Sequence, residues 1–368
     1  MFTAARTKTA VLVQQVGIGD LLWHMPYFER IAHDSAGGQV AVIASPSTGA
    51  RDLLDGCHWV SSVIDFDRHP RKHENRKGRH AGVIGLLRIA AELRPHRFDR
   101  ILMFSGSVNR ALMAWLARIP QRGAYGFSAT QRLFLNQPPY IKRYAGSSVA
   151  VFSEAASFSI AHGLCSERLV PRLTRPETLI DLVKPRLAHL PRPLYAFAIG
   201  TSEPYKQWGS RNYASLATWL LSQGCGVLLL GGPSEEALAL EIMKGVPPRV
   251  RPGIHAQTRE SIGMTIAALW LSDACVGNDT GVTNLAVACD RPAFVLLGPR
   301  PLLDLDPRMT MLQAARLECI SVEAVWTVLN EHRAPGFECS DAPHADIQSL
   351  PALPSLISRS ALGSASLR

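Results

Sequence analysis

The chain has 368 residues, 47% of them hydrophobic, which is enough for two domains with sizeable cores. No apolar run reaches the roughly 20 residues that span a bilayer, and the first one, residues 10–13, is too short for a signal peptide. The formal net charge of +9 favours an anionic partner, and seven scattered cysteines without a CxxC pair indicate reduced thiols in a cytoplasm rather than disulfides or a zinc site.

Strands and helices alternate through the first half of the chain. Apolar runs predict strands over residues 9–16, 39–44, 60–66 and 98–104. Helices are predicted after the glycine turn at residues 17–20 and over residues 81–93, 108–119 and 153–162. This alternation is typical of a parallel, doubly wound sheet.

A second series of the same kind follows a stretch rich in Pro and Arg, which predicts an interdomain linker over residues 166–192. Its strands are predicted over residues 195–199, 227–230, 274–276 and 293–297, and its helices over residues 213–221, 235–243, 261–271, 285–289 and 322–329. We therefore expect an α/β fold of two Rossmann-like domains, residues 1–165 and 193–334, facing each other across a cleft. The Pro/Ser-rich tail, residues 335–368, is expected to pack back on the first domain.

The stretch of residues 277–286 lies between a predicted strand and a predicted helix. Gly277 and Gly281 allow a tight turn and a close approach to a ligand. The amides that follow Asp279 open a helix N-terminus, which favours an anionic group such as a phosphate. The alternative is that Asp279 or Thr280 caps an ordinary crossover helix.

Three further glycine-containing turns end predicted strands of both domains. In residues 17–20, Asp20 either caps the following helix or serves as a general base. In residues 200–208, hydroxyl side chains followed by Lys206 suit a diphosphate, or else form a polar surface loop. In residues 231–236, either glutamate accepts from ribose hydroxyls or simply lies at a helix N-terminus.

The densest basic stretch is residues 68–80. It has no interleaved aromatic side chains of the kind that stack bases, so a nucleic-acid partner is not expected. A phosphate-bearing substrate or anionic lipid headgroups fit this charge, and the alternative is a solvated loop. Asp65 and Asp67 form the DxD pattern of metal-dependent glycosyltransferases, but they precede the basic stretch, and we do not expect them to bind a metal.

Together these turns resemble glycosyltransferase family 9, the bacterial heptosyltransferases of lipopolysaccharide core assembly, over most of the chain. The cluster at Asp279 is the most diagnostic part. The matching positions are Gly17-Ile18-Gly19-Asp20 with Pro26, Thr201-Ser202 with Lys206 and Trp208, Leu230-Gly231-Gly232-Pro233, and Asp279-Thr280-Gly281 with Leu285-Ala286, Arg291-Pro292 and Gly298-Pro299.

The resemblance implies a GT-B fold, an acceptor domain followed by a nucleotide-sugar donor domain, and inverting transfer without a metal or other cofactor. It implies Asp20 as the base that deprotonates the acceptor hydroxyl. The predicted donor-binding residues are Thr201, Ser202, Lys206, Gly231, Gly232, Glu235, Asp279, Thr280 and Gly281. The predicted acceptor-binding residues are Gly19, Arg71, Lys72, Arg76 and Lys77.

The chain also departs from the family pattern. Asn284 stands where the motif usually has His, and Gln14 and Gln15 occupy a region where an Arg is often found. The predicted function is transfer of heptose from ADP-heptose to an anionic glycolipid of the lipopolysaccharide inner core, with peripheral contact at the cytoplasmic face of the inner membrane. The alternatives are another nucleotide sugar with a non-lipid acceptor, a nucleotide-sugar epimerase, and a non-catalytic nucleotide-binding relative.

Overall fold

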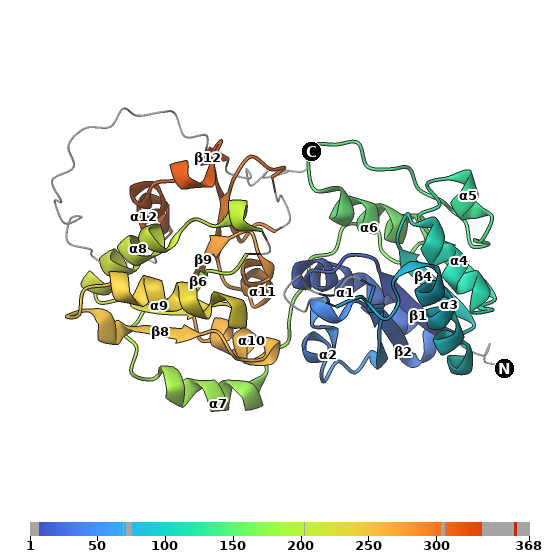
Figure 1. Ribbon diagram of the computed structural model, residues 1–368, viewed down its shortest axis with the longest axis horizontal. Helices are drawn as coiled ribbons and strands as arrows, with labels where there is room; N and C mark the ends of the chain where they lie inside the picture. Colours follow the sequence, from blue (N-terminus) through green and yellow to red (C-terminus); the bar gives the residue numbers. More distant parts are fainter. Residues whose placement is uncertain are drawn as a thin grey trace, which may run out of the picture. The chain divides into compact units, whose positions relative to one another are not determined.

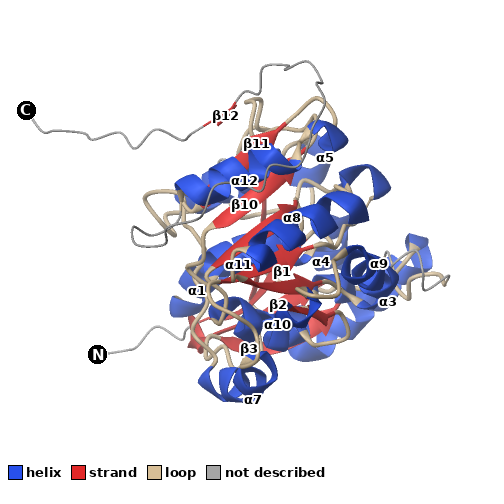
Figure 2. Cartoon of the chain, turned by 90° about the vertical axis from the view of Figure 1, so that its left-hand side faces the viewer, coloured by secondary structure: helices blue, strands red, loops and turns tan. Residues whose placement is uncertain are grey.

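The computed structural model divides into two compact units, Met1–Pro171 and Arg172–Arg368, each built on a largely parallel sheet flanked by helices (Figure 1 and Figure 2). The residues that the structure describes are 7–68, 70, 76–201, 203–302, 306–332 and 357–358. Both units have the doubly wound strand order, so the predicted α/β fold of two Rossmann-like domains is confirmed.

The described part of the N-terminal unit has a five-stranded parallel sheet in the order β3-β2-β1-β4-β5. Its strands are β1 (Thr7–Val13), β2 (Ser35–Ala44), β3 (Val60–Asp65), β4 (Arg100–Phe104) and β5 (Gln121–Ala124). Its helices are α1 (Ile18–His33), α2 (Ala50–Leu53), α3 (Gly82–Leu93), α4 (Val108–Leu116), α5 (Ala129–Arg132) and α6 (Ala150–Ala161), with 3-10 turns η1 (Pro46–Thr48) and η3 (Arg94–His96). The strand order reverses between β1 and β4.

The strands of this unit form where apolar runs allow burial on both faces of a parallel sheet. Residues 10–13 of β1 and 40–44 of β2 are almost fully buried. Strand β5 is not predicted by this pattern, because its first two residues, Gln121 and Arg122, interrupt the apolar run. Strand β1 ends three residues before its predicted end, which leaves residues 14–17 as the loop that enters α1.

In the described part of the C-terminal unit, seven strands form one sheet in the order β12-β11-β10-β9-β6-β7-β8. Its strands are β6 (Leu194–Ala198), β7 (Gly226–Leu230), β8 (Ile254–Gln257), β9 (Ala274–Asn278), β10 (Ala293–Leu297), β11 (Met309–Gln313) and β12 (Ile357–Ser358). Its helices are α7 (Glu177–Leu187), α8 (Ser210–Ser222), α9 (Glu236–Gly245), α10 (Ile262–Trp270), α11 (Gly281–Ala288) and α12 (Val322–Glu331), with 3-10 turns η4 (Pro204–Lys206), η5 (Pro233–Glu235), η6 (Arg251–Gly253) and η7 (Leu317–Cys319). The strand order reverses between β6 and β9.

The stretch predicted as a linker, residues 166–192, contains helix α7. Its residues Ile180, Val183 and Leu187 recur at helical spacing, are buried, and belong to a helix that packs against α10. The second unit therefore begins well before residue 193. Helix α7 was missed because the Pro and Arg residues around it obscure a short apolar stripe.

The tail departs from expectation where the structure describes it. Strand β12 pairs antiparallel with β11 in the second sheet, not with the N-terminal unit. The rest of the predicted tail, residues 335–356 and 359–368, lies outside the described residues. Strands β8 and β11 were also missed, because polar residues such as His255 and Gln313 dilute their short apolar patterns.

Each unit has its own core between sheet and helices. In the N-terminal unit, Ile43 and Met103 of the sheet pack in one cluster with Ile89 of α3. In the C-terminal unit, Phe197 and Tyr213 belong to a cluster between the sheet and α8. Among the described residues, no helix combines the length and apolar character needed to cross a membrane.

Candidate functional site

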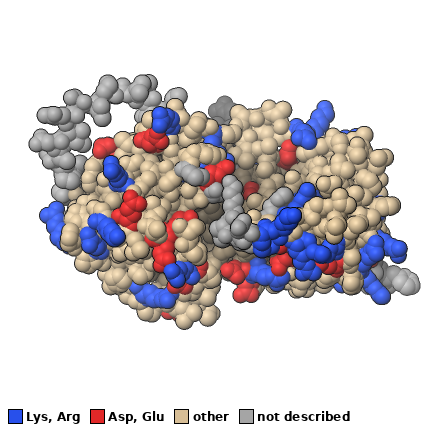
Figure 3. Space-filling model, viewed as in Figure 1, with Lys and Arg blue, Asp and Glu red and all other residues tan. Residues whose placement is uncertain are grey.

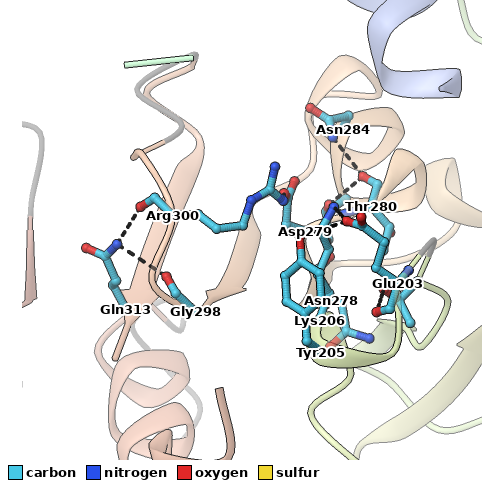
Figure 4. Close-up of polar contacts among 12 residues, drawn as sticks. Glu203, Tyr205, Lys206, Asn278, Asp279, Thr280, Asn284, Gly298, Arg300 and Gln313 are labelled. Carbon is cyan, nitrogen blue, oxygen red and sulfur yellow. Dashed lines mark hydrogen bonds and ion pairs between the residues drawn. The ribbon is translucent and has the colours of Figure 1, made fainter. Parts of the chain in front are cut away.

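The polar residues of the C-terminal unit gather at the carboxyl ends of β6 and β9, where the strand order reverses. This is the place where doubly wound sheets bind ligands. The loop after β6 (residues 199–209), the N-terminus of α11 and the loop after β10 (residues 298–302) come together there (Figure 4). We call this group of loops the donor loops, because they carry most of the predicted donor-binding residues.

Asn278, fully buried at the end of β9, ties the loop after β6 to the sheet. Its side chain bonds four groups of that loop, all at 3.2 Å: Nδ2 donates to the carbonyl oxygens of Ile199 and Gly200 and to Oε1 of Gln207, and Oδ1 accepts from the N–H of Trp208. Buried amides are costly without such partners. Asn278 therefore holds the loop that carries Lys206 in one position.

Gly277 and Asn278 were expected in the turn, and the structure instead makes them the last residues of β9. Glycine is required at 277 because β6 lies very close: a Cβ there would lie 2.3 Å from the carbonyl oxygen of Ala198. The turn proper is Asp279 and Thr280, and α11 begins at Gly281. The close packing of β6 and β9 is what brings the two loops together.

Thr280 is the N-cap of α11 and shares a capping box with Thr283, whose Oγ1 accepts from the N–H of Thr280 at 3.3 Å, yet its own hydroxyl makes no capping hydrogen bond. Its carbonyl oxygen accepts from Nδ2 of Asn284 at 2.7 Å and from Oγ1 of Thr283 at 2.8 Å. Its own Oγ1 is buried without a partner among the described residues. Ordinary capping leaves this hydroxyl unexplained, whereas an anion at the helix N-terminus would give it one.

Arg300, in the loop after β10, forms an ion pair with Asp279 (Figure 4). Their side chains are 32% and 15% exposed, so the pair is only partly buried. Gln313 of β11 fixes this loop, because its Nε2 donates to the carbonyl oxygen of Arg300 at 2.7 Å. Arg300 was not among the predicted residues, although the sequence contains a signal for it. It is a basic residue at the carboxyl end of the strand that follows the diagnostic motif.

Lys206 lies on η4 with its side chain 13% exposed, and its Nζ is 2.7 Å from Oε2 of Glu203. The same oxygen accepts from the hydroxyl of Tyr205 at 2.8 Å. These two bonds, with the charges of Lys206 and Arg300, lower the pKa of Glu203. The donor loops therefore combine two cations with two carboxylates and a helix N-terminus.

The remaining predicted donor-binding residues have defined local roles. Oε2 of Glu235 accepts from the N–H of Gly232 at 2.7 Å, and a Cβ on Gly231 would lie 2.8 Å from Cβ of Glu235. The hydroxyl of Thr201 donates to the carbonyl oxygen of Glu203 at 2.9 Å. Ser202 lies outside the described residues. Because Glu235 packs against Gly231 and bonds to Gly232, both glycines are needed to keep Glu235 in this position.

In the N-terminal unit, Asp20 lies in the first turn of α1, at the carboxyl end of β1. Its Oδ2 accepts from the N–H of Gly17 at 3.1 Å, so the carboxylate caps the helix that carries it. Gly19 precedes it in the same turn. A carboxylate has two oxygens and about four acceptor positions, so capping and the predicted role as a base are compatible.

Arg76 of the basic stretch, and the nearby Arg51, pair with the two aspartates that precede the stretch. Nη1 of Arg76 lies 2.5 Å from Oδ2 of Asp67, and Arg51 pairs with Asp65 at 2.8 Å. Burial alone would raise the pKa of Asp67, but the bonds from Arg76 and the Arg79 backbone lower it. Lys77 is exposed. Two further predicted residues lie outside the described residues, Arg71 and Lys72.

Asp65 and Asp67 each pair with an arginine, Arg51 and Arg76 respectively. In the part of the chain that the structure describes, no cluster of three or more His, Cys, Asp or Glu side chains suits a metal ion. On the face drawn in Figure 3, basic side chains gather on the N-terminal unit with acidic ones among them. The structure thus gives these carboxylates arginine partners.

Two doubly wound domains with an anion-suited site at the switch point of the second define a GT-B type fold, as predicted. The family model described as Glycosyltransferase family 9 (heptosyltransferase) matches residues 86–325. The chain therefore belongs to glycosyltransferase family 9, and the family prediction is confirmed.

The curated relatives that match this chain are heptosyltransferases. Lipopolysaccharide heptosyltransferase 2 of Salmonella typhimurium is 27% identical over 223 residues, and lipooligosaccharide heptosyltransferase 2 of Haemophilus influenzae is 26% identical over 230 residues. Each match covers 58% of this chain and 63% of the relative, so the chain spans less than two thirds of the length of these curated relatives.

Solved structures share the fold over nearly their whole length. E. coli ADP-heptose lps heptosyltransferase II is 20% identical with a TM-score of 0.68, covering 88% of this chain and 98% of that one. The glycosyl transferase family 9 protein of Veillonella parvula is 16% identical with a TM-score of 0.71, covering 89% and 98%. At these identities the similarity concerns the fold.

Proposed function

We propose that the protein transfers heptose from ADP-heptose to an anionic glycolipid of the lipopolysaccharide inner core, with inversion at the anomeric carbon. Family membership and the heptosyltransferase relatives support this chemistry. E. coli heptosyltransferase WaaC has been solved with ADP and with ADP-2-deoxy-2-fluoro heptose, which supports an ADP-sugar donor. Within this chain, the observation that carries the proposal is the set of cations around the N-terminus of α11.

In the proposed reaction the leaving group is a nucleoside diphosphate, which gains negative charge as the glycosidic bond breaks. Lys206, Arg300 and the first-turn amides of α11 are positioned to offset that charge. Both cations have acidic partners, Glu203 and Asp279, so the diphosphate competes with these carboxylates. The Oγ1 of Thr280, which has no partner among the described residues, adds a donor at the same helix end.

Asp20 is the proposed general base. Its carboxylate accepts the proton of the acceptor hydroxyl while that oxygen bonds to the anomeric carbon and the bond from carbon to the diphosphate oxygen breaks. The bond from the N–H of Gly17 to Oδ2 orients the carboxylate at the start of α1. No metal is required in this scheme, because protein cations neutralise the leaving group.

The acceptor is proposed to bind the N-terminal unit, where the basic residues Arg71, Lys72, Arg76 and Lys77 of the sequence would attract an anionic glycolipid. Basic side chains attract anionic headgroups at roughly 1 kcal/mol each near a membrane surface. This interaction supports a location at the cytoplasmic face of the inner membrane as part of the proposal. The basic stretch lacks stacking aromatics, which argues against a nucleic-acid partner.

The test uses the full chain and calorimetric titration of ADP, UDP, GDP, AMP and adenosine, followed by product analysis with the preferred nucleotide sugar. The proposal requires ADP to bind more tightly than the other diphosphates and much more tightly than adenosine. It also requires transfer to a lipopolysaccharide core acceptor that persists in EDTA. Preference for another diphosphate would favour another donor sugar, and conversion of the donor without any acceptor would favour an epimerase. A loss of activity in EDTA that Mg²⁺ or Mn²⁺ restores would contradict the metal-free scheme.

A further inference from the structure

Arg110, in the first turn of α4, is a buried arginine for which the described residues supply no carboxylate partner. Arg110 as a whole is 5% exposed, and its Nε and Nη1 atoms are buried without a hydrogen-bond partner among the described residues. The guanidinium carbon lies 4.4 Å from the centre of the Phe66 ring. A cation–π contact of this kind supplies no hydrogen-bond acceptor, so the donors of Arg110 remain unsatisfied.

The surroundings of Arg110 are positive as well. It lies at the N-terminus of α4, where the helix dipole disfavours a cation. The side chain of the N-cap residue Ser107 makes no capping bond, and its N–H donates to Oγ of Ser105 at 3.0 Å. Burial, and then the nearby charge of Arg68, lower the pKa of Arg110 to about 10, so it stays protonated at neutral pH.

A buried charge is retained in proteins when it is paired and hydrogen-bonded, because desolvation without a partner is expensive. A guanidinium with two unsatisfied donors beside a second arginine and a helix N-terminus therefore fits a planar or tetrahedral oxyanion. Three features come from different elements: Arg110 and the helix end belong to α4, and Arg68 follows by two residues the Phe66 whose ring contacts Arg110.

The loop before α4 is held in place by side-chain bonds. The hydroxyl of Ser105 donates to Oε1 of Gln14, which joins this loop to the loop after β1. The buried Gln131 donates through Nε2 to the carbonyl oxygen of Ser105 at 3.0 Å. Since β1 and β4 are paired at the switch point of the N-terminal sheet, Arg110 lies at the same sheet edge as Asp20.

We propose that Arg110, Arg68 and the N-terminus of α4 form a binding site for an oxyanion, a carboxylate or a phosphate. In the proposed transfer reaction this group belongs to the acceptor, and that assignment rests on the proposed function. The site shares only Arg68 with the basic stretch of residues 68–80 and does not include Arg76, which pairs with Asp67.

The test is the thermal unfolding of the full chain at constant ionic strength, in chloride and with added inorganic phosphate or acetate. ADP is present at saturation so that the donor loops do not bind the probe. Wild type should gain melting temperature with at least one of the two anions. Arg110→Met should lose this gain, with the apparent dissociation constant for the anion raised by at least about 10-fold. Phosphate acting alone would assign a phosphate ligand, and acetate acting alone a carboxylate.

In chloride, Arg110→Met should melt no lower than wild type, because the substitution removes an unpaired buried charge while it keeps most of the side-chain volume. Lys142→Gln, an exposed cation on the same unit, serves as the control and should behave as wild type. An anion response that survives Arg110→Met, or a large loss of melting temperature in chloride, would overturn the proposal. Titration of ADP should give the same affinity for Arg110→Met as for wild type. If neither protein binds ADP, that result would count against the proposed function and not against the oxyanion site.

Discussion

Arg300 and Asp279 form an ion pair that joins the loop after β10 to the N-terminus of α11. The pair lies beside Glu203 and Tyr205, since the charge of Arg300 influences the pKa of both groups. A second cation, Lys206, is bound to Glu203 within the same group of loops. The donor loops are therefore a network of alternating charges, in which each cation has a carboxylate that a diphosphate would have to replace.

We predict that Arg300→Gln weakens ADP binding by about 1.5–3 kcal/mol, the usual scale of a charge-assisted hydrogen bond. Adenosine should lose much less, because it carries no diphosphate. Calorimetric titration of the two ligands measures the difference. Arg316→Gln is the matched control, since Arg316 is an exposed arginine of the same unit that pairs with Glu318. Equal losses for ADP and adenosine would show that Arg300 supports the fold of the site rather than the diphosphate.

For Lys206 we predict the same pattern: Lys206→Ala weakens ADP binding by about 1.5–3 kcal/mol and adenosine binding little. Glu203→Gln should act in the opposite direction and tighten ADP binding, because Glu203 competes for the Lys206 ammonium. Titration of both variants tests the two signs together. If Glu203→Gln weakens ADP binding, Glu203 orients Lys206 instead of competing with the ligand.

The fold could be predicted from the sequence because its strands are continuous apolar runs. β10 has the predicted bounds, and β2, β3, β6 and β7 were located to within a few residues. The failures share one cause, since β5, β8 and β11 are short and contain polar residues such as Gln121 and His255. These segments become strands because they pair with neighbouring strands, and this pairing leaves no pattern in the local sequence.

The candidate site could be predicted where a motif marks it and not where contact between loops creates it. Lys206 and Thr280 were found because each follows a strand at a glycine turn. Arg300 was missed, because its ion pair with Asp279 joins loops far apart in sequence and leaves no local pattern. Glu203 lies only three residues before Lys206, but the sequence does not show that the two side chains pair. Arg110 was missed for a similar reason, since its lack of a partner is visible only in three dimensions.

For Asp20 we predict that Asp20→Asn preserves ADP binding and lowers turnover by about 10²-fold or more, the usual scale for a general base. Asparagine can keep the capping bond from the N–H of Gly17, so the fold of the turn should persist. Steady-state kinetics at saturating donor measures the effect, and Asp52→Asn, a change at an exposed carboxylate of the same unit, is the control. Turnover near that of wild type would remove Asp20 from the mechanism.

We predict that the stability of the protein depends on pH through His24. It is fully buried one turn after Asp20, its Nδ1 lies 2.6 Å from the carbonyl oxygen of Asp20, and its Nε2 is buried without a partner among the described residues. Burial lowers its pKa to about 4, although the bond to Asp20 opposes this shift. The unfolded chain binds the proton near pH 6.5, so the free energy of unfolding should fall by on the order of 3 kcal/mol from pH 6.5 to 4.

His24→Gln should flatten that part of the pH profile, because it removes the titrating group and keeps a donor for the carbonyl of Asp20. His33→Gln is the matched control, an exposed histidine at the end of the same helix, and it should leave the profile as in wild type. Denaturant unfolding at a series of pH values measures both. An unchanged slope in His24→Gln would assign the acid sensitivity to other groups.

The basic stretch is predicted to act on the acceptor through its summed charge. Replacing Arg71, Lys72, Arg76 and Lys77 by Ser should raise the apparent KM for an anionic lipid acceptor and flatten its salt dependence, while nucleotide affinity stays unchanged. Exposed charges contribute little singly and steer ligands as a group, and salt screens them over about 10 Å at 0.1 M. Initial rates over a range of salt concentrations measure both effects.

Arg76 needs a control of its own, because its bond to Asp67 helps to fix the end of this stretch. Arg76→Ser alone should therefore reveal any structural contribution, which would appear as a lower melting temperature with the salt dependence of KM retained. The variant with Arg71, Lys72 and Lys77 replaced should instead keep the melting temperature and lose the salt dependence. If the acceptor KM of that triple variant is unchanged at low salt, these side chains form only a solvated surface, and the proposed lipopolysaccharide acceptor would depend on Arg110 and on the family relationship.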